Sequence, residues 1–233
     1  MSARPTSVLD REHLPYPDVV AVYEMTEQEY LDWDHEGGLA DWVDGKVYHY
    51  MVASKTHQTI VQFLSSLLGF YGELTNAGRV LAGPYAMRTL LSRRWREPDL
   101  MFIAAEHSER STEQGLIGPA DLVVEVVSPG SPRRDRVDKL AEYAALGVRE
   151  YWVIDPRIRQ RRATFYVLDD SGKYNEGQEA TDGSFHSTVA QGFWLRSEWL
   201  WDPSPNAPRR LAEILGVAPF VMPIGGDKGT RES

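Results

Sequence analysis

Cysteine is absent from the 233-residue sequence, and its absence removes several kinds of chemistry. Disulfide bonds, thiolate nucleophiles and zinc sites with thiolate ligands are all excluded. Long apolar runs are lacking as well, because no stretch approaches the roughly 18 apolar residues of a membrane span. Residues 1–18 are polar and contain no apolar segment of a signal peptide. We therefore expect a cytoplasmic protein with no membrane partner.

An excess of basic residues is also missing. The sequence has 25 Lys and Arg residues against 34 Asp and Glu residues, which gives a net charge of −9. Proteins that bind nucleic acid nonspecifically normally present a basic face, so this charge argues against such binding by the whole surface. A local basic strip on an acidic protein remains compatible with it.

The length and composition are sufficient for one sizeable hydrophobic core. With 42% hydrophobic residues in 233, one domain is the expected organisation. We expect a flexible N-terminal arm over residues 1–20 and a single domain over residues 21–202. Residues 203–233 are expected to form a linker, a short helix and a disordered tail, because they begin with a Pro-rich spacer and end without apolar residues.

The N-terminal third predicts a short helix, a hairpin and a long core helix. Thr26 and Glu29 have the spacing of a capping box, which predicts that a helix begins there. Asp44 and Gly45 stand between two short β-like runs and predict a hairpin turn. Residues 54–76 repeat apolar side chains at spacings of three and four, which predicts a helix with one buried face.

The centre of the sequence has the pattern of an α/β core. Three short apolar runs are bounded by Pro or Gly, as in strands that are buried on both faces of a sheet. A segment with a helical period lies between the second and third runs. We predict an α/β fold with a mixed central β-sheet flanked by helices. The three strands are residues 97–103, 121–127 and 150–155, and the helix is residues 132–147.

Further strands are predicted on either side of this core. Residues 79–82 and 85–91 are β-like and lead into the core through a basic loop at residues 93–96. Residues 161–168 and 183–195 have the pattern of meander strands after the core. They predict an antiparallel C-terminal extension of the sheet.

The predicted helix 132–147 carries two stripes. Ser131 is expected to cap its start and Gly147 to end it. The first stripe is apolar and is expected to be buried; it consists of Val137, Leu140, Ala141 and Ala144. The second, adjoining stripe repeats every four residues and consists of Asp135, Lys139 and Tyr143. This spacing places Lys139 at the border of the buried face.

Acidic residues interrupt two of the predicted core strands. Asp99 and Glu125 stand where a purely structural strand would have Val or Leu, and a buried carboxylate is costly unless it is paired or bound to a metal. Two carboxylates on adjacent strands suit Mg²⁺, which prefers oxygen ligands. Lys139 on the following helix could position a water or neutralise charge in the transition state. These residues predict phosphodiester hydrolysis by a metal-activated water.

Each of these residues also has a structural interpretation. Asp99 could be a hydrogen-bonded residue at a strand end, and Glu125 could form an ion pair with an arginine. Lys139 could pair with Asp135 on a solvated helix face. His57 could be a core histidine, and Tyr143 could serve only for packing.

Several short motifs together resemble one known family. They are Glu29-Tyr30-Leu31, Val43-Asp44-Gly45, His57, Gly83-Pro84, Pro98-Asp99-Leu100, Asp121-Leu122-Val123-Val124-Glu125-Val126 with Ser128-Pro129, Asp135 with Lys139, Gly147-Val148, Glu150-Tyr151-Trp152 and Asp155-Pro156. With them, residues 26–167 resemble the Uma-type restriction endonuclease family of the PD-(D/E)XK nuclease superfamily. Each motif is weak alone, and the combination is specific. The resemblance implies a restriction-endonuclease-like fold.

The resemblance also implies roles for individual residues. Asp99 and Glu125 would be metal ligands, together with the backbone carbonyl of Val126, and the metal would be Mg²⁺ or Mn²⁺. The superfamily lysine would lie two residues after the Glu, where this sequence has Val127. Lys139 is the expected replacement, so the catalytic set implied is Asp99, Glu125 and Lys139.

Other residues are expected around this set. Asp41 stands where such families usually have a Glu, and together with His57 and Tyr143 it is expected to border the site. Arg96, Arg133 and Arg134 are expected to form a phosphate-binding rim. The substrate implied is nucleic acid, with DNA as the expected form, and a homodimer would suit cleavage of two strands.

Two alternatives stay open at this point. A binding protein on a catalytically degenerate nuclease scaffold is favoured by the net charge of −9 and by Val127 in the place of the lysine. A hydrolase of small phosphoesters would need the metal site but no long basic groove.

Overall fold

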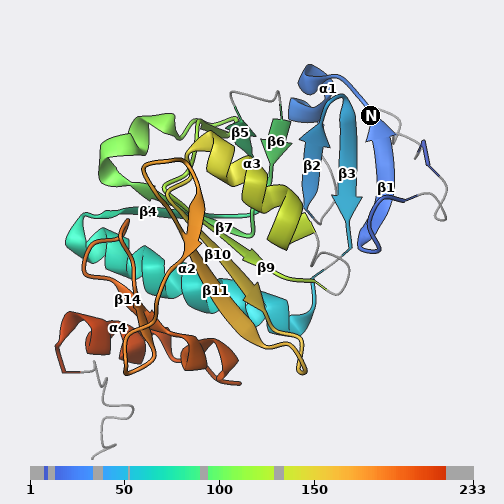
Figure 1. Cartoon of the computed structure of the whole chain (residues 1–233). Helices are drawn as coiled ribbons and strands as arrows, with labels where there is room; N and C mark the ends of the chain where they lie inside the picture. The colour runs from blue at the N-terminus through green and yellow to red at the C-terminus, as the bar shows by residue number, and fades with distance from the viewer. Residues whose placement is uncertain are drawn as a thin grey trace, which may run out of the picture.

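The computed structural model describes residues 8–9, 14–33, 39–51, 53–89, 94–128 and 134–218. Within them the chain forms two six-stranded β-sheets, a two-stranded sheet and helices packed against them (Figure 1). The predicted α/β class with mixed sheets and flanking helices is confirmed. Within these residues, no helix combines the length and apolar character that a membrane span requires.

The N-terminal sheet has the strand order β1-β3-β2-β6-β5-β8. Its strands are β1 (Val19–Glu24), β2 (Ala40–Val43), β3 (Lys46–Tyr50), β5 (Met87–Thr89), β6 (Arg94–Arg96) and β8 (Leu116–Ile117). The predicted hairpin joins β2 to β3 through Asp44 and Gly45, which both have positive φ, as a tight two-residue turn requires. The predicted capping box begins α1 (Glu27–Leu31) at Thr26.

The central sheet has the strand order β12-β11-β10-β9-β7-β4. Its strands are β4 (Gly78–Ala82), β7 (Leu100–Ala104), β9 (Leu122–Val126), β10 (Glu150–Asp155), β11 (Arg162–Leu168) and β12 (Tyr174–Glu176). β9 and β10 run parallel, and the other neighbouring pairs run antiparallel. The sheet is therefore mixed, and β11 and β12 form its antiparallel C-terminal extension.

Two helices cover opposite faces of the central sheet. The predicted long helix is α2 (Lys55–Thr75), which begins at the Ser54 cap and ends at Asn76 in the left-handed conformation. Its apolar stripe packs against alternate strand residues such as Val124 and Trp152. α3 (Lys139–Leu146) packs on the other face, where Val123 and Val127 project. Side chains alternate along a strand, so Glu125 projects toward α3.

The remaining elements are one helix, a small sheet and three short helices. α4 (Ala207–Leu215) contacts α2, as Figure 1 shows. β13 (Ser184–His186) and β14 (Trp194–Arg196) form the two-stranded sheet. The short helices are η2 (Ala105–Arg110), the π-helical turn η3 (Arg134–Asp138) that leads into α3, and η4 (Ser197–Trp201).

Some predicted boundaries were wrong. Residues 94–96 were expected in a loop, yet they form β6, which pairs with β2 across a long sequence separation. Residues 19 and 20 were placed in the N-terminal arm, yet they begin β1, which pairs with β3. Asp99 was expected inside a strand and lies immediately before β7. The first two pairings are nonlocal, so the local pattern carries no sign of them.

The buried stripe of the predicted helix 132–147, which the structure forms as η3 and α3, was also predicted wrongly. Val137 and Ala141 are exposed, whereas Asp135, Lys139 and Tyr143 are buried. The cause is the buried carboxylate of Glu125 on β9, to which Lys139 and Tyr143 both donate hydrogen bonds. The polar stripe therefore faces the sheet. The expected cap at Ser131 lies outside the described residues.

Candidate active site

The register of the central sheet brings Asp99 beside Glu125. In the antiparallel pairing of β7 with β9, Leu100 lies opposite Val124, so the preceding Asp99 lies at the end of β9. The Val126 amide donates a hydrogen bond to Asp99 Oδ2 at 2.7 Å. Both carboxylates are buried. Two residues that are 26 positions apart in the sequence thus meet at one end of the neighbouring strands β7 and β9.

Glu125 binds two side chains from α3. Lys139 Nζ donates a hydrogen bond to Glu125 Oε1 at 2.6 Å, and the Tyr143 hydroxyl donates to the same oxygen at 2.9 Å. Lys139 is only 3% exposed, so its interpretation as a residue of a solvated face is wrong. The polar stripe of the helix exists because both side chains reach a buried carboxylate on β9.

Asp99 is held by the first turn of α2. Ser54 accepts a hydrogen bond from the His57 amide, which fixes the start of the helix, and His57 Nε2 lies 3.0 Å from Asp99 Oδ1. Burial lowers the pKa of His57, but the hydrogen bond and the charge of Asp99 outweigh burial and raise the pKa. The contact with Asp99 thus favours the charged form of His57.

The charges around Glu125 oppose one another. Burial raises the pKa of Glu125, Lys139 lowers it, and the nearby carboxylates of Asp99 and Asp135 raise it again, with an upward result. Burial lowers the pKa of Lys139, but Glu125, Asp41 and Asp135 outweigh burial and raise it. Lys139 thus remains an ammonium group at neutral pH. Lys139 is therefore one of several buried cations, with Arg96 and Arg134, that lie among these carboxylates.

The comparisons with known proteins fit this arrangement. The family described as "Uma2: Putative restriction endonuclease" matches residues 27–214. The chain belongs to the Uma2 family. Membership in this family supports a nuclease function.

A solved structure resembles the fold of this Uma2 family member. It is a protein of Anabaena variabilis described as "a putative nuclease belonging to DUF820", with a TM-score of 0.60 and 15% sequence identity. The match covers 76% of this chain and 97% of that chain. No curated protein matches the sequence significantly. At this identity the likeness shows the fold, and it confirms the predicted nuclease-like architecture.

Asp41 lies in the N-terminal sheet of this Uma2 protein and is fully buried. Its Oδ2 accepts hydrogen bonds from Arg96 at 2.8 Å and from the Tyr50 hydroxyl at 2.9 Å, and its Oδ1 accepts the Glu97 amide at 2.9 Å. Burial raises the pKa of Asp41, but Arg96, Lys139 and the Glu97 amide outweigh burial and lower it to about 2. Asp41 on β2 therefore binds β6 and the Glu97 amide, in the segment that leads to Asp99.

We expect Asp41→Asn to lower the free energy of unfolding by about 3 kcal/mol at pH 7, because it removes one partner of a buried ion pair. The pKa of Asp41 is 3.8 when unperturbed and about 2 in the fold, so the stabilisation is complete above about pH 4 and is lost as the pH falls through about 2. Chemical denaturation of both proteins at several pH values measures this difference.

The matched control is Asp44→Asn, in the turn of the same hairpin. Asp44 pairs with Arg94, but its side chain is 63% exposed, so we expect a loss below about 1 kcal/mol. Asn also tolerates the positive φ at this position. Equal losses for the two variants, or a loss for Asp41→Asn that does not change with pH, would contradict the role assigned to Asp41.

The arginines expected to form a phosphate-binding rim are engaged with carboxylates. Arg96 is buried and binds Glu142 as well as Asp41. Arg134 is buried, donates two hydrogen bonds to Asp18, and lies over the Tyr50 ring at 4.2 Å. Neither guanidinium group is available to a substrate in this arrangement. Arg133 lies outside the described residues.

The donor atoms at the site suit a hard divalent cation. Among the described residues, no three His, Cys, Asp or Glu side chains are arranged as a complete metal cluster. Mg²⁺ needs only one or two carboxylates, because waters and substrate oxygens complete its shell. Asp99 and Glu125 supply such carboxylates where β9 ends beside the start of β7. The Mg²⁺ fit is therefore chemical and rests on these two residues.

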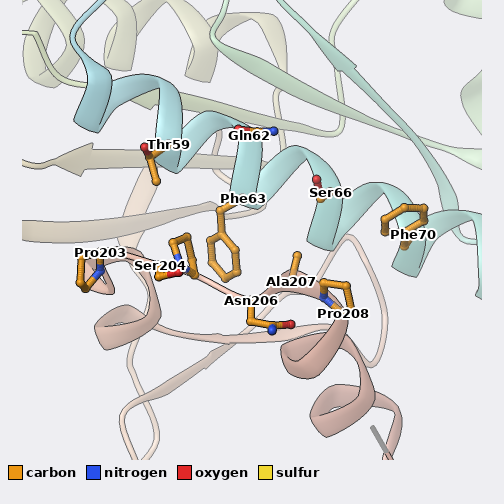
Figure 2. Close-up of a pocket in the computed structure, with 11 residues that line it drawn as sticks. Thr59, Gln62, Phe63, Ser66, Phe70, Pro203, Ser204, Asn206, Ala207 and Pro208 are labelled. Atoms are coloured by element: carbon orange, nitrogen blue, oxygen red, sulfur yellow. The ribbon is translucent and has the colours of Figure 1, made fainter. Parts of the chain in front are cut away.

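A groove of about 620 Å³ lies elsewhere, between α2 and residues 203–208 (Figure 2). Thr59, Gln62 and Phe70 of α2 line it from one side, and Asn206 and Pro208 line it from the other. None of the residues that line this groove is charged. Because no acid, base or cation lines this groove, it offers no means of cleaving a phosphodiester. The candidate active site is therefore the cluster of Asp99, Glu125 and Lys139.

Sequence reasoning missed some residues around the site. Asp135 is buried and contributes to the charge around Glu125 and His57. Its spacing of four before Lys139 was noted, both as a family motif and as an ion pair on a solvated face, but no role in the site was assigned to it. Asp18 binds Arg134 across 116 residues of sequence, and no local pattern could have indicated it.

Proposed function

We propose that this Uma2 family member is an endonuclease that hydrolyses phosphodiester bonds of DNA with Mg²⁺ or Mn²⁺. The single observation that carries the proposal is the buried pair of Glu125 and Lys139 beside Asp99. Removing two charges from water costs several kcal/mol per ion, and hydrophobic residues of the same volume would often be at least as stable. A gain in stability is therefore a weak reason for the pair, and its position beside Asp99 supports a catalytic role.

The chain's own residues divide the work. Asp99 and Glu125 would hold the metal, which when bound would polarise the phosphoryl oxygen and lower the pKa of the attacking water. Lys139 stays protonated, so it would act as a cation that orients the water and stabilises developing negative charge. His57 and the Val126 amide hold Asp99, and Tyr143 holds Glu125. The ligand role of the Val126 carbonyl and the border role of Tyr143 stay predictions.

We expect the wild-type protein to cleave duplex DNA with Mg²⁺ and to lose this activity in EDTA. Glu125→Gln keeps the size and the hydrogen-bond acceptor for Tyr143 but removes the negative charge, so we expect cleavage to fall by at least about 100-fold. Gel analysis of DNA cleavage measures both effects.

The matched control for Glu125→Gln is Glu198→Gln, at an exposed position in η4. We expect cleavage by this control to equal that of the wild type. Undiminished Mg²⁺-dependent cleavage by Glu125→Gln would show that the site has been placed wrongly.

A second candidate is a binding protein on a degenerate nuclease scaffold. It is favoured by Val127, which is buried where the superfamily lysine would lie, and by the pairing of Arg96 and Arg134 with carboxylates. This alternative expects DNA binding without cleavage under any divalent metal. The homodimer that would suit cleavage of two strands stays a prediction.

A further inference from the structure

The turn that joins β10 to β11 is strongly basic. Residues 157–162 contain four arginines and no acidic residue, in a chain whose net charge is −9. The Gln160 amide donates a hydrogen bond to the Arg157 carbonyl at 2.7 Å, which closes the turn. The β10 and β11 strands hold it from both sides, so its side chains are displayed from a fixed base. We refer to residues 157–162 as the arginine turn.

The arginines of this turn differ in their partners. Arg157 donates two side-chain hydrogen bonds to Asp155, and Arg162 pairs with Glu176. Arg159 and Arg161 are exposed and have no carboxylate partner among the described residues. Between Arg157 and Arg159, Ile158 is 84% exposed and packs in no core cluster. The arginine turn thus presents two uncompensated cations and an apolar side chain to solvent.

The arginine turn lies at the same end of the central strands as the candidate site. β10 runs parallel to β9, with Val153 beside Glu125, so the chain after β10 continues past the end of β9 where Asp99 lies. β10 ends at Asp155, two residues beyond Val153, and the arginine turn begins two residues later at Arg157. Figure 1 shows the β10–β11 turn projecting at the same end of the sheet at which α2 begins.

A salt bridge connects the arginine turn to the helix that carries Lys139. Asp155, at the end of β10, lies 3.3 Å from Arg136 of η3 and 2.7 Å from Arg157. Arg136 in turn stands three residues before Lys139. Basic side chains therefore continue from the site helix to the tip of the turn, although the arginines nearest the carboxylates are neutralised.

We propose that the arginine turn binds the phosphate backbone of the nucleic acid on which the site acts. Guanidinium groups bind phosphate oxygens through paired hydrogen bonds, and contacts of this kind position a duplex without reading its sequence. The proposal rests on the proposed nuclease function, because it assigns the turn to the same substrate. It explains how a chain of net charge −9 can attract nucleic acid to the end of the sheet at which the candidate site lies.

The test is the salt dependence of duplex DNA binding by Arg159→Ala/Arg161→Ala, measured by fluorescence anisotropy in EDTA. Each phosphate contact contributes about 0.9 to the slope of log affinity against log salt, so the slope should fall by about 1.8. The loss of affinity caused by the two substitutions should therefore be roughly tenfold larger at about 50 mM salt than at about 200 mM salt. Because EDTA prevents cleavage, a failure of the catalytic proposal leaves this measurement intact.

The matched control is Arg79→Ala/Arg149→Ala, which removes the same charge at the opposite end of the central strands. Arg79 pairs in register with Ile103 at the far end of β7, and Arg149 immediately precedes β10. Both are exposed. We expect DNA binding by this control to keep the wild-type slope.

Three results would overturn the inference. One is a wild-type slope for Arg159→Ala/Arg161→Ala, and another is an equal loss in the control variant. The third concerns the exposed Ile158 among cations, which could also suit a membrane surface. Binding of anionic phospholipid vesicles through the arginine turn, without DNA binding, would assign the turn to lipid instead.

Discussion

Lys139→Met is expected to lower Mg²⁺-dependent DNA cleavage by about 10²–10³-fold, which is the usual effect of removing one preorganised charge at a transition state. Met nearly matches the length of the lysine side chain but has no ammonium group. The reason for the loss is the contact of Lys139 Nζ with Glu125 at 2.6 Å, which places the cation beside the carboxylates that would hold the metal. The measurement is the rate of duplex cleavage at saturating Mg²⁺.

Stability and activity can be separated at this pair. Lys139→Met alone leaves Glu125 buried beside Asp99 and Asp135, so we expect it to lower the free energy of unfolding by about 3–5 kcal/mol. The double variant Glu125→Gln/Lys139→Met removes both charges and should regain most of that stability while remaining inactive. The control Lys173→Met, at an exposed turn, should change neither property. An active double variant would refute the catalytic role of the pair.

Asp99→Asn is expected to reduce cleavage by a similar or larger factor, about 10²–10⁴-fold, because it removes a charge that would hold the metal. The substitution also weakens the contact with His57, which should cost about 2 kcal/mol of unfolding free energy. Activity must therefore be compared with that of a variant that is destabilised to the same degree but lies away from the site.

The sheet supplies such a control in Asp121. Like Asp99, Asp121 is buried, accepts a hydrogen bond from one backbone amide and contacts one histidine, in this case Ala104 and His107 at 2.8 Å. It lies at the opposite end of β9. Asp121→Asn should lose comparable stability and keep nuclease activity. If both variants lost activity equally, the loss would reflect the fold and not the site.

Much of the fold was predictable because its signals are local. The Thr26 capping box, the turn at Asp44 and Gly45, and the apolar period of α2 each specify an element within a few residues of sequence. Asp99 and Glu125 could be identified because a carboxylate in an apolar strand has few inexpensive explanations. The structure brings these residues together with Lys139 and His57, as the sequence pattern suggested.

The features that the sequence did not reveal have a common physical cause, which is that they depend on partners far away in sequence. Arg96 and Arg134 looked like a phosphate-binding rim, yet their partners Asp41 and Asp18 lie 55 and 116 residues away. The inward side of α3 depended on hydrogen bonds of Lys139 and Tyr143 to Glu125 on another element, which no apolar period reveals. The exposed charge of the arginine turn likewise became apparent only when neighbouring carboxylates could be located.

The most direct test of the central claim is a calorimetric titration of Mg²⁺ and of Mn²⁺ into the wild-type protein, Asp99→Asn and Asp121→Asn, with duplex DNA present. We expect the wild type and Asp121→Asn to bind at least one of these ions, and Asp99→Asn to lose that binding. Metal binding that survives in Asp99→Asn, or a wild type that binds neither ion, would contradict the assignment of Asp99 and Glu125 to a metal-dependent nuclease site.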